Sequence, residues 1–438
     1  MQDKFYKFTT DDGFTFSVVE IPNSGMFQYE LATDTGADIE QTFLNKTGRW
    51  VFGISHLIEH LSFKNTQDYD TETLMHLLKT EGAYNAYTDF DRIVYYYNTI
   101  SRKFKTAITL TLNVGLNTLQ RIPDHEFTSE KSVVANEIRR YHDDSQTIFS
   151  FNATPTAIGR NVNDNILGDA DLLENFTLVD CVDVKCSFLK LANVVHRISF
   201  DPEEISLDEI TDFVKSEYLR LSHNIPDSLV QISRQEYDAG AIKKFTSIDG
   251  SHVKLESNSE QSLIQIFMAC EPKTFLLPTS MAQMYVGHMG STSLNELIRE
   301  KHGLTYGISF YHQVIGKQHA FVFSADVPKD KFDLTMSLFE EAIISSVESF
   351  GDLQFQELEL QYELQLMNAN MNRKTALSSH RTCELNPEWI KYEEDYKKSI
   401  SSARKKIHED YFTKEKIQEV MDEMKECVKN KKYIVIKS

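Results

Sequence analysis

Cysteine is scarce in this 438-residue chain, and its copies follow no pattern. An odd and low number of thiols argues against a disulfide framework; the five are Cys181, Cys186, Cys270, Cys383 and Cys427. The spacing of Cys181 and Cys186 does not suit a zinc knuckle, and no second pair completes one. We therefore expect reduced thiols, as in a cytosol-like compartment.

Long apolar runs and an export signal are also missing. The opening residues, MQDKFYKFTTDDGFTF, do not join a basic segment to an apolar stretch, as a secretory signal would. No stretch reaches the roughly 18 apolar residues that mark a membrane span. These absences predict a cytoplasmic protein that does not interact with membranes.

Positive charge is in deficit, with 46 Lys and Arg against 65 Asp and Glu and a formal net charge of −19. Such a chain repels phosphate backbones, which argues against generic nucleic-acid binding. The simplest interpretation of the charge is solubility. The functional alternative is an acidic cavity that attracts basic peptides.

Local patterns in the first half predict alternating strands and helices. Asp70 or Thr71 would cap one helix, Gly82 would follow its end, and Ser129 would cap another. Strands are expected at 5–10 and 14–21, a strand pair at 25–36, helices at 53–63 and 70–82, strands at 83–90 and 92–100, and helices at 104–120 and 128–144.

The second half repeats this rhythm, which indicates an ancient duplication. We expect a strand at 262–270, helices at 280–289 and 291–303, a hairpin at 304–327, and helices at 330–350 and 355–372. Residues 222–250 lack strong periodicity and contain Pro226, Gly240 and Gly250. A domain boundary is placed there, giving an N-terminal domain at 1–225 and a C-terminal domain at 226–438.

The stretch GISHLIEHLSFKNT, residues 53–66, contains two histidines and a glutamate within five positions. On a helix His56 and His60 share a face, so both imidazoles could bind one Zn²⁺. Glu59 could reach a water on that metal without being a ligand. This order, His-x-x-Glu-His, is the inverzincin pattern.

A catalytic zinc needs a third protein ligand and one open position. Glu130 and Glu137 lie two helical turns apart in SEKSVVANEIRR, so they share a face. Glu137 could be the third ligand, with Glu130 orienting a histidine N–H or balancing charge. The alternatives are a chance motif and a solvated helix face. The motif's apolar helix argues against chance, because unpaired polar groups would be costly there.

At this point the chain resembles the M16 (pitrilysin/insulinase-type) zinc metallopeptidases, and most closely their short two-domain members such as the mitochondrial processing peptidase β-subunit and its bacterial relatives. The matching stretches are TGADIE (35–40), GISHLIEHLSFKNT, EGAYNAYTDFDRIVYY (81–96), Glu130-x6-Glu137 and LNELIREKHGLTYGIS (294–309). The family's Lys-Gly-Thr is Lys64-Asn65-Thr66 here, its Gly-Gly is Glu81-Gly82, and Ile93 replaces a threonine. These departures remove neither a ligand nor the base, so activity is expected, although selectivity could differ.

The resemblance implies an α+β fold of two homologous domains, each a mostly antiparallel sheet packed by helices and together half of a clam-shaped chamber. It implies one Zn²⁺ per chain held by His56, His60 and Glu137, with Glu59 as general base and Arg299 and Tyr306 holding substrate or the developing oxyanion. Substrate peptides would pair with the strand that contains Asn85, Ala86, Tyr87 and Thr88.

Because one chain carries both the zinc motif and the Arg/Tyr pair, a homodimer is favoured, with Arg299 and Tyr306 serving either their own zinc or the partner's. A heterodimer with another M16-like subunit is the alternative. Three rival functions stay open: a catalytically silent M16-fold subunit that binds peptides, a different metallohydrolase, and a structural or assembly protein.

Overall fold

The computed structural model describes residues 2–160, 164–240, 249–256, 259–269, 276–315, 318–371 and 389–438. Two of the cysteines predicted to be reduced, Cys270 and Cys383, lie outside these residues. So does part of the predicted domain boundary at 222–250. The chain forms two compact units, each assembled from three segments. The first comprises Met1–Arg140, Asn163–Ala241 and Ala376–Ala403, and the second Tyr141–Val162, Ile242–Thr375 and Arg404–Ser438.

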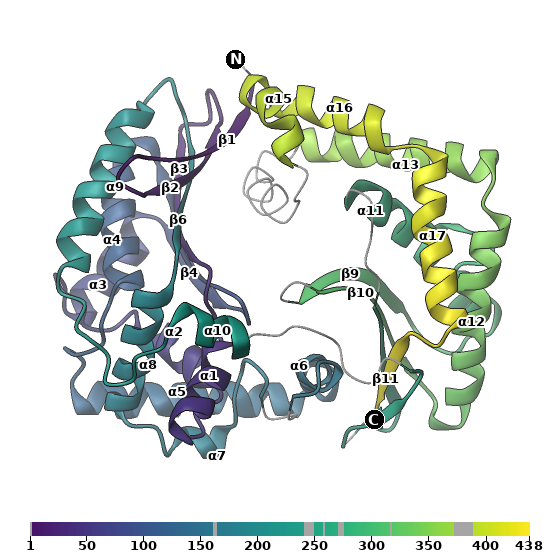
Figure 1. Ribbon diagram of the computed structural model, residues 1–438, viewed down its shortest axis with the longest axis horizontal. Coiled ribbons are helices and arrows are strands. Elements are labelled where there is room, and N and C mark those ends of the chain that lie inside the picture. The colour runs from purple at the N-terminus through teal and green to yellow at the C-terminus, as the bar shows by residue number, and fades with distance from the viewer. Residues whose placement is uncertain are drawn as a thin grey trace. The chain divides into compact units, whose positions relative to one another are not determined.

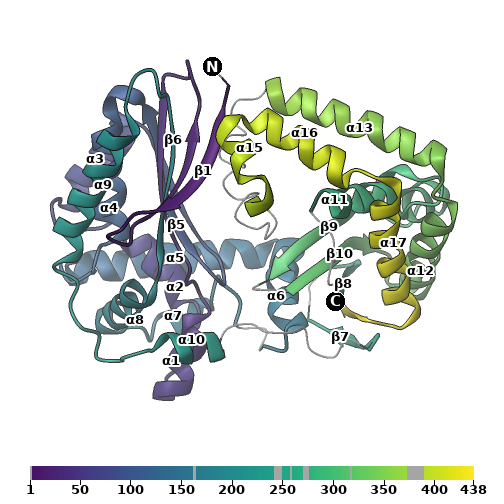
Figure 2. The same cartoon turned by 45° about the horizontal axis from the view of Figure 1, so that its top comes forward.

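Each unit includes one helical segment from the opposite half of the sequence (Figure 1 and Figure 2). Helix α6 (Ser145–Ala157) packs on strands of the second sheet, where the Gln265 amide donates a 3.0 Å hydrogen bond to Ser150. Helix α15 (Glu393–Lys398) packs on the first strand of the first sheet, with Tyr396 edge-on to Phe5 at 5.7 Å. A single cut at 225/226 therefore does not separate the units, and the roles predicted for the two halves stay predictions.

The first unit is built on a six-stranded sheet in the order β1-β2-β6-β3-β5-β4. All neighbours are antiparallel except β2 and β6. The strands are β1 (Lys4–Thr9), β2 (Thr15–Glu20), β3 (Met26–Thr33), β4 (Ala83–Thr88), β5 (Ile93–Ile100) and β6 (Val194–Phe200). The longer helices are α1 (Ile39–Thr47), α2 (Ile54–Leu61), α3 (Thr71–Glu81), α4 (Phe104–Gly115), α5 (Asp124–Asp143), α8 (Leu178–Leu191) and α9 (Leu207–Ser222), and two short ones are α7 (Ala170–Leu173) and α10 (Arg234–Gly240).

The second unit has a five-stranded sheet in the order β7-β11-β8-β10-β9, in which only β7 and β11 are parallel. Its strands are β7 (His252–Lys254), β8 (Ser262–Ala269), β9 (Ile308–Ile315), β10 (Gln318–Val327) and β11 (Tyr433–Lys437). The helices are α11 (Leu276–Met284), α12 (Phe332–Ser349), α13 (Asp352–Met371), α16 (Ile400–Tyr411) and α17 (Lys414–Lys429), with π-helical segments at Tyr285–Met289 and Asn295–Lys301.

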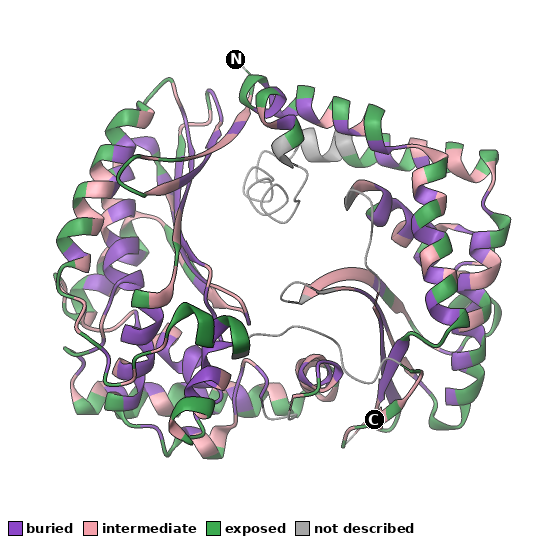
Figure 3. Ribbon diagram, viewed as in Figure 1, coloured by how far each residue is buried: buried purple, intermediate pink, exposed green. Residues whose placement is uncertain are grey.

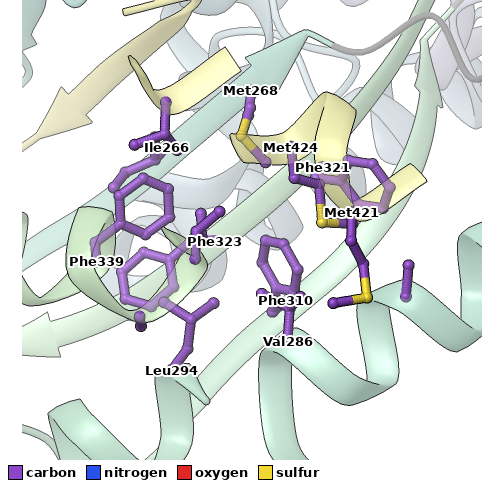
Figure 4. Close-up of a cluster of buried hydrophobic side chains, with 14 of the residues drawn as sticks. Ile266, Met268, Val286, Leu294, Phe310, Phe321, Phe323, Phe339, Met421 and Met424 are labelled. Carbon is purple, nitrogen blue, oxygen red and sulfur yellow. The ribbon is translucent and has the colours of Figure 1, made fainter. Parts of the chain in front are cut away.

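The core of the second unit is apolar and lies between its sheet and helices α12 and α17 (Figure 4). Ile266, Phe323 and Phe339 are fully buried there, and Met421 and Met424 fill the space beside Phe321. In Figure 3 most of β11 is buried, while the helices show alternating buried and exposed positions. This alternation is the pattern of amphipathic helices that cover a sheet.

The α+β fold with two related, mostly antiparallel sheets is confirmed. Helix α3 begins and ends as predicted, since the Asp70 carboxylate accepts from the Thr73 N–H at 2.7 Å and Gly82 follows Glu81. Two local predictions are wrong. Residues 25–36 contain one strand, β3 (Met26–Thr33), and not a strand pair, because no turn residue interrupts positions 26–33. Ser129 is not a cap, because α5 already begins at Asp124, directly after Pro123, a residue that favours a helix start.

Candidate metal centre

Helix α2 carries His56, Glu59 and His60, and its apolar face fixes it in the first unit. Ile54, Leu57, Ile58 and Leu61 are at most 2% exposed. The helix starts after Gly53, whose φ of +88° suits glycine. A Cβ there would lie 2.4 Å from the Cα of Gly168. This close approach puts the 165–168 turn directly against the first turn of α2.

Both histidines are held through Nδ1, which leaves Nε2 as the free ring nitrogen. The Nδ1 of His56 lies 3.2 Å from the Leu167 carbonyl oxygen, which can only accept, so the ring donates there. The Nδ1 of His60 lies 3.1 Å from Oε1 of Glu130. Such partners fix the tautomer of a metal-binding histidine.

Helix α5 brings Glu137 to the two free nitrogens. Its Oε2 lies 3.3 Å from Nε2 of His60 and 4.0 Å from Nε2 of His56. In the described part of the chain this is the one group of three or more His, Cys, Asp or Glu side chains arranged to hold a metal. Ligands about 2.0–2.1 Å from a tetrahedral Zn²⁺ are separated by about 3.3–3.4 Å. The donor set and its spacing therefore fit zinc after a small closure on the His56 side.

Glu59 points to the strand that lies beside α2. The Thr88 hydroxyl on β4 donates a 2.6 Å hydrogen bond to Oε2 of Glu59. Burial raises the pKa of Glu59, although this hydrogen bond and the charge of His60 oppose the shift. A carboxyl group with a raised pKa is suited to accept and return a proton near neutral pH.

Glu130 contacts both His60 and Lys64, and its negative charge favours the protonated form of His60. Its Oε2 lies 2.5 Å from the Lys64 ammonium. Burial would raise the pKa of Glu130, but the bonds to His60 and Lys64 outweigh burial and lower it. Burial likewise opposes the charge on His60, yet Glu130 and the other carboxylates raise its pKa. For His56, burial and the nearby His60 lower the pKa, which favours the neutral imidazole.

The predicted substrate-binding residues lie on β4, which is an edge of the described sheet and pairs there with β5. Asn85 is exposed, and its side-chain oxygen accepts from the Ala86 N–H at 2.9 Å. Tyr87 and Thr88 are half-buried. An edge strand beside the metal centre is the geometry that strand addition by a peptide requires.

Arg299 and Tyr306 lie in the second unit. Arg299 belongs to the π-helical segment Asn295–Lys301, and Tyr306 follows it before β9 with 91% of its surface exposed. The Arg299 guanidinium lies 5.8 Å from the centre of the Tyr306 ring. The structure thus brings these two side chains together on an exposed face of their own unit.

Two family models match the chain in succession. Residues 49–170 match the model described as insulinase (peptidase family M16), and residues 204–366 match the model described as peptidase M16 inactive domain. The chain belongs to the M16 peptidase family. The first match contains His56, His60 and Glu137, and the second contains Arg299 and Tyr306.

Several M16 relatives are named as proteases. An uncharacterized zinc protease of Rickettsia felis is 21% identical over 80% of each chain, and one of Rickettsia bellii is 22% identical over 64% of this chain, spanning 65% of its own length. The mitochondrial-processing peptidase subunit beta of Saccharomyces cerevisiae is 22% identical over 39% of this chain and 36% of its own.

Solved structures show the same M16 fold. A protease from Helicobacter pylori has a TM-score of 0.70 at 15% identity, covering 100% of this chain and 99% of that one. A peptidase M16 inactive domain from Pseudomonas fluorescens has a TM-score of 0.72 at 14% identity, covering 99% and 97%. Among the described helices, none combines the length and apolar character needed to cross a bilayer.

Sequence reasoning missed three contributors to this centre. The Leu167 carbonyl carries no side-chain signal, and the bond from Thr88 to Glu59 joins residues that are distant in sequence. Lys64 was noted for its place in the motif but not as the partner of Glu130. Its position four residues after His60, on the same side of a continuing helical turn, was the available signal.

Proposed function

We propose that this M16 protein is a zinc-dependent metalloendopeptidase that hydrolyses peptides or unfolded, presequence-like segments. The observation that supports it best is the convergence of His56, His60 and Glu137, with the Glu59 carboxylate beside them and bonded to β4, the edge strand of the described sheet. Names of relatives that include zinc proteases and a processing peptidase subunit are consistent with it.

In this proposal His56, His60 and Glu137 hold one Zn²⁺ per chain. When bound, the metal supplies Lewis-acid chemistry that polarises the scissile carbonyl and makes water a better nucleophile at neutral pH. Glu59 takes the proton from the attacking water and delivers it to the leaving amine. Glu130 keeps the Nδ1 of His60 occupied, so that Nε2 stays directed at Glu137.

The remaining roles are also proposals. The substrate backbone pairs with β4 along Asn85, Ala86, Tyr87 and Thr88, while Arg299 and Tyr306 hold the backbone or the developing oxyanion. The protein acts as a homodimer that closes a chamber, or as a heterodimer with another M16-like subunit. A closed chamber would admit extended chains, and the net charge of −19 would favour basic ones. A cytoplasmic location stays a prediction.

The decisive experiment compares wild type with Glu59→Gln, using metal analysis and a quenched basic peptide library. We expect about one zinc in both proteins and a loss of cleavage of about 100-fold or more in the variant, the scale of a lost general base. Equal cleavage by both would contradict the proposed role of Glu59. Zinc without cleavage in wild type would favour the alternative, a silent or partner-dependent M16 subunit that binds peptides.

A further inference from the structure

The loop at 36–38, which continues into the first turn of α1 at Ile39 and Glu40, connects the two elements that the proposed function uses, helix α2 and the β4–β5 hairpin. At one end its main chain is attached to the hairpin turn. The Ala37 N–H donates to the Asp89 carbonyl at 2.9 Å, and the Asp38 N–H donates to the Phe90 carbonyl at 2.9 Å. Asp89 directly follows Thr88, the residue that holds Glu59. The loop is therefore fixed to the turn of the hairpin whose strand β4 adjoins the metal centre.

Gly36 permits this attachment. A Cβ at Gly36 would lie 2.3 Å from the Asp89 carbonyl oxygen and 2.4 Å from the Arg92 nitrogen. Both neighbours are backbone atoms, which cannot move aside without moving the turn itself. Glycine is therefore the residue that lets the loop approach the hairpin closely enough for its two hydrogen bonds.

At its other end the loop enters α1, and Glu40 in the first turn of α1 presents a buried carboxylate to α2. Glu40 is 2% exposed. Its Oε2 accepts from the Gly53 N–H at 3.0 Å, and its Oε1 accepts from the Ser55 N–H at 2.8 Å. The first N–H groups of a helix need partners from outside it, and Gly53 at the N-cap has no side chain to supply one. A negative charge is also favourable at this end of a helix dipole.

The placement of this carboxylate affects the metal centre directly, because His56 immediately follows Ser55. Helix α2 has only eight residues, too few to be stable without contacts from the rest of the fold. Its other end is held separately, where the Ser62 hydroxyl donates to the Ile58 carbonyl at 2.7 Å and accepts from Lys185 at 3.2 Å. At the first turn, Glu40 adds a charged anchor for the backbone to the apolar contacts of Ile54 and Leu57.

We propose that Glu40 is a positioning residue for the metal centre. Its carboxylate ties the first turn of α2 to the loop that is bonded to the β4–β5 hairpin, and thereby sets where Nε2 of His56 lies relative to Nε2 of His60 and Oε2 of Glu137. This inference rests on the proposed function for the identity of the metal, and it adds a residue that touches neither metal nor substrate.

The test variant is Glu40→Gln, which keeps the shape but faces one of the two N–H donors with an amide NH₂. The matched control is Asp201→Asn in the same unit. Asp201 is also 2% exposed and also accepts from backbone N–H groups, among them those of Gly25 at 2.9 Å and Glu203 at 3.0 Å, directly after β6. Both changes replace a buried carboxylate that accepts backbone hydrogen bonds, and only the Glu40 carboxylate adjoins α2.

Three quantities would be compared: the zinc dissociation constant by chelator competition, the melting temperature of the metal-free protein, and kcat and KM on a cleaved peptide. We expect Glu40→Gln to weaken zinc binding by about 10-fold or more, which is the loss typical of mutating a residue that holds a metal ligand in place. Asp201→Asn should weaken zinc binding by less than about twofold. We also expect kcat to fall in Glu40→Gln with KM little changed.

Zinc affinity equal in the two variants, with both folded, would overturn the proposal whatever their activity. If wild type binds zinc but cleaves nothing, the proposed peptidase function fails, while the two zinc affinities still decide the role of Glu40. Where Glu40→Gln does not fold, Glu40→Asp replaces it, with the same expected order. If wild type binds no zinc, amide hydrogen exchange across residues 53–62 decides: faster exchange only in the Glu40 variant supports the proposal, and equal exchange in both variants overturns it.

Discussion

Strands β2, β6, β3, β5 and β4 of the first sheet have the same order and relative directions as β7, β11, β8, β10 and β9 of the second. The buried residues of the two units nevertheless differ. Among the described residues, every buried Asp, Glu, Lys, Arg and His side chain lies in the first unit, and the buried polar side chains of the second are neutral. Burying charge is costly. Among the described residues, the free-energy cost of burying ionisable groups therefore arises only in the first unit, which contains the metal centre, although both units share the topology.

Each unit also has a close pair of histidines, and these pairs differ in how their nitrogens are used. The rings of His56 and His60 are 5.0 Å apart, and both direct Nδ1 to other partners, leaving Nε2 for Glu137. The rings of His312 and His319 are 5.1 Å apart, but Nε2 of His312 is 3.0 Å from Nδ1 of His319. The second pair thus uses its facing nitrogens on each other, so proximity of two histidines does not by itself make a metal centre.

The largest expected effect comes from removing one histidine of each pair. His60→Ala should abolish stoichiometric zinc binding and cleavage, weakening affinity by more than about 100-fold, beyond the loss caused by outer partners of a ligand. His319→Ala should still bind one zinc per chain. Metal analysis and chelator competition on both proteins check this. A lower zinc content in His319→Ala would contradict this contrast, because it would show that His312 and His319 also bind metal.

The next effect concerns the buried charge of Lys185 on α8. This side chain is fully buried, and its ammonium donates to Ser62 at 3.2 Å and Tyr95 at 3.1 Å. Burial lowers the pKa of Lys185 from 10.5 to about 7, although the charge of Glu59 opposes the shift. Below pH 7 the lysine is charged in both the folded and unfolded states, so the folded state bears the full cost. As pH rises from 7 toward 10.5, the folded state loses its proton first and the cost fades.

Lys185→Met should therefore be more stable than wild type at pH 6 by about 2–4 kcal/mol, given about 1.4 kcal/mol for each unit of pKa shift and some relaxation. The advantage should shrink by pH 9.5, because the folded wild type then holds Lys185 neutral. In the variant Ser62 and Tyr95 can still bond to each other at 3.0 Å. Denaturant unfolding at several pH values measures this. Lys190→Met, an exposed change on the same helix that removes an ion pair with Asp227, is the control and should not stabilise the protein at pH 6. A pH-independent difference for Lys185→Met would contradict the prediction.

How far the sequence predicts this site depends on the range of the interactions. His56 and His60 could be predicted as a pair because helical spacing places them on a common face, whereas the resemblance of Glu130-x6-Glu137 to the M16 motif assigned Glu137 to the same site. The β4–β5 hairpin and the Asp70 cap also follow from local patterns. The role of Glu40 could not be predicted, because its bonds to Gly53 and Ser55 exist only after α1 has packed beside α2. The hydrogen bond from Lys185 to Ser62 could not be predicted for the same reason. Nor could the packing of α6 in the second unit and of α15 in the first.

A third prediction asks whether the second unit contributes to the reaction. Arg299→Ala should leave zinc content unchanged and lower kcat/KM by about 100-fold, the scale of a lost oxyanion donor. Lys301→Ala, on the same π-helical segment, is the control and should have little effect. Cleavage assays with metal analysis check both. Wild-type activity in Arg299→Ala would confine the chemistry to the first unit and sharpen the contrast between the two units.

The smallest expected effect tests whether the strand edge helps the base. Thr88→Val keeps the shape of the side chain but removes the hydroxyl that bonds Glu59 at 2.6 Å. A hydrogen bond to a charged group contributes about 1.5–3 kcal/mol, so kcat should fall by about 10-fold or more, with zinc content unchanged. Thr88→Ser, which keeps the hydroxyl and loses only a methyl group, should recover most of the activity. If Thr88→Ser is as slow as Thr88→Val, the methyl group of Thr88 matters more for kcat than its hydrogen bond to Glu59. The prediction that this bond assists the base would then be wrong.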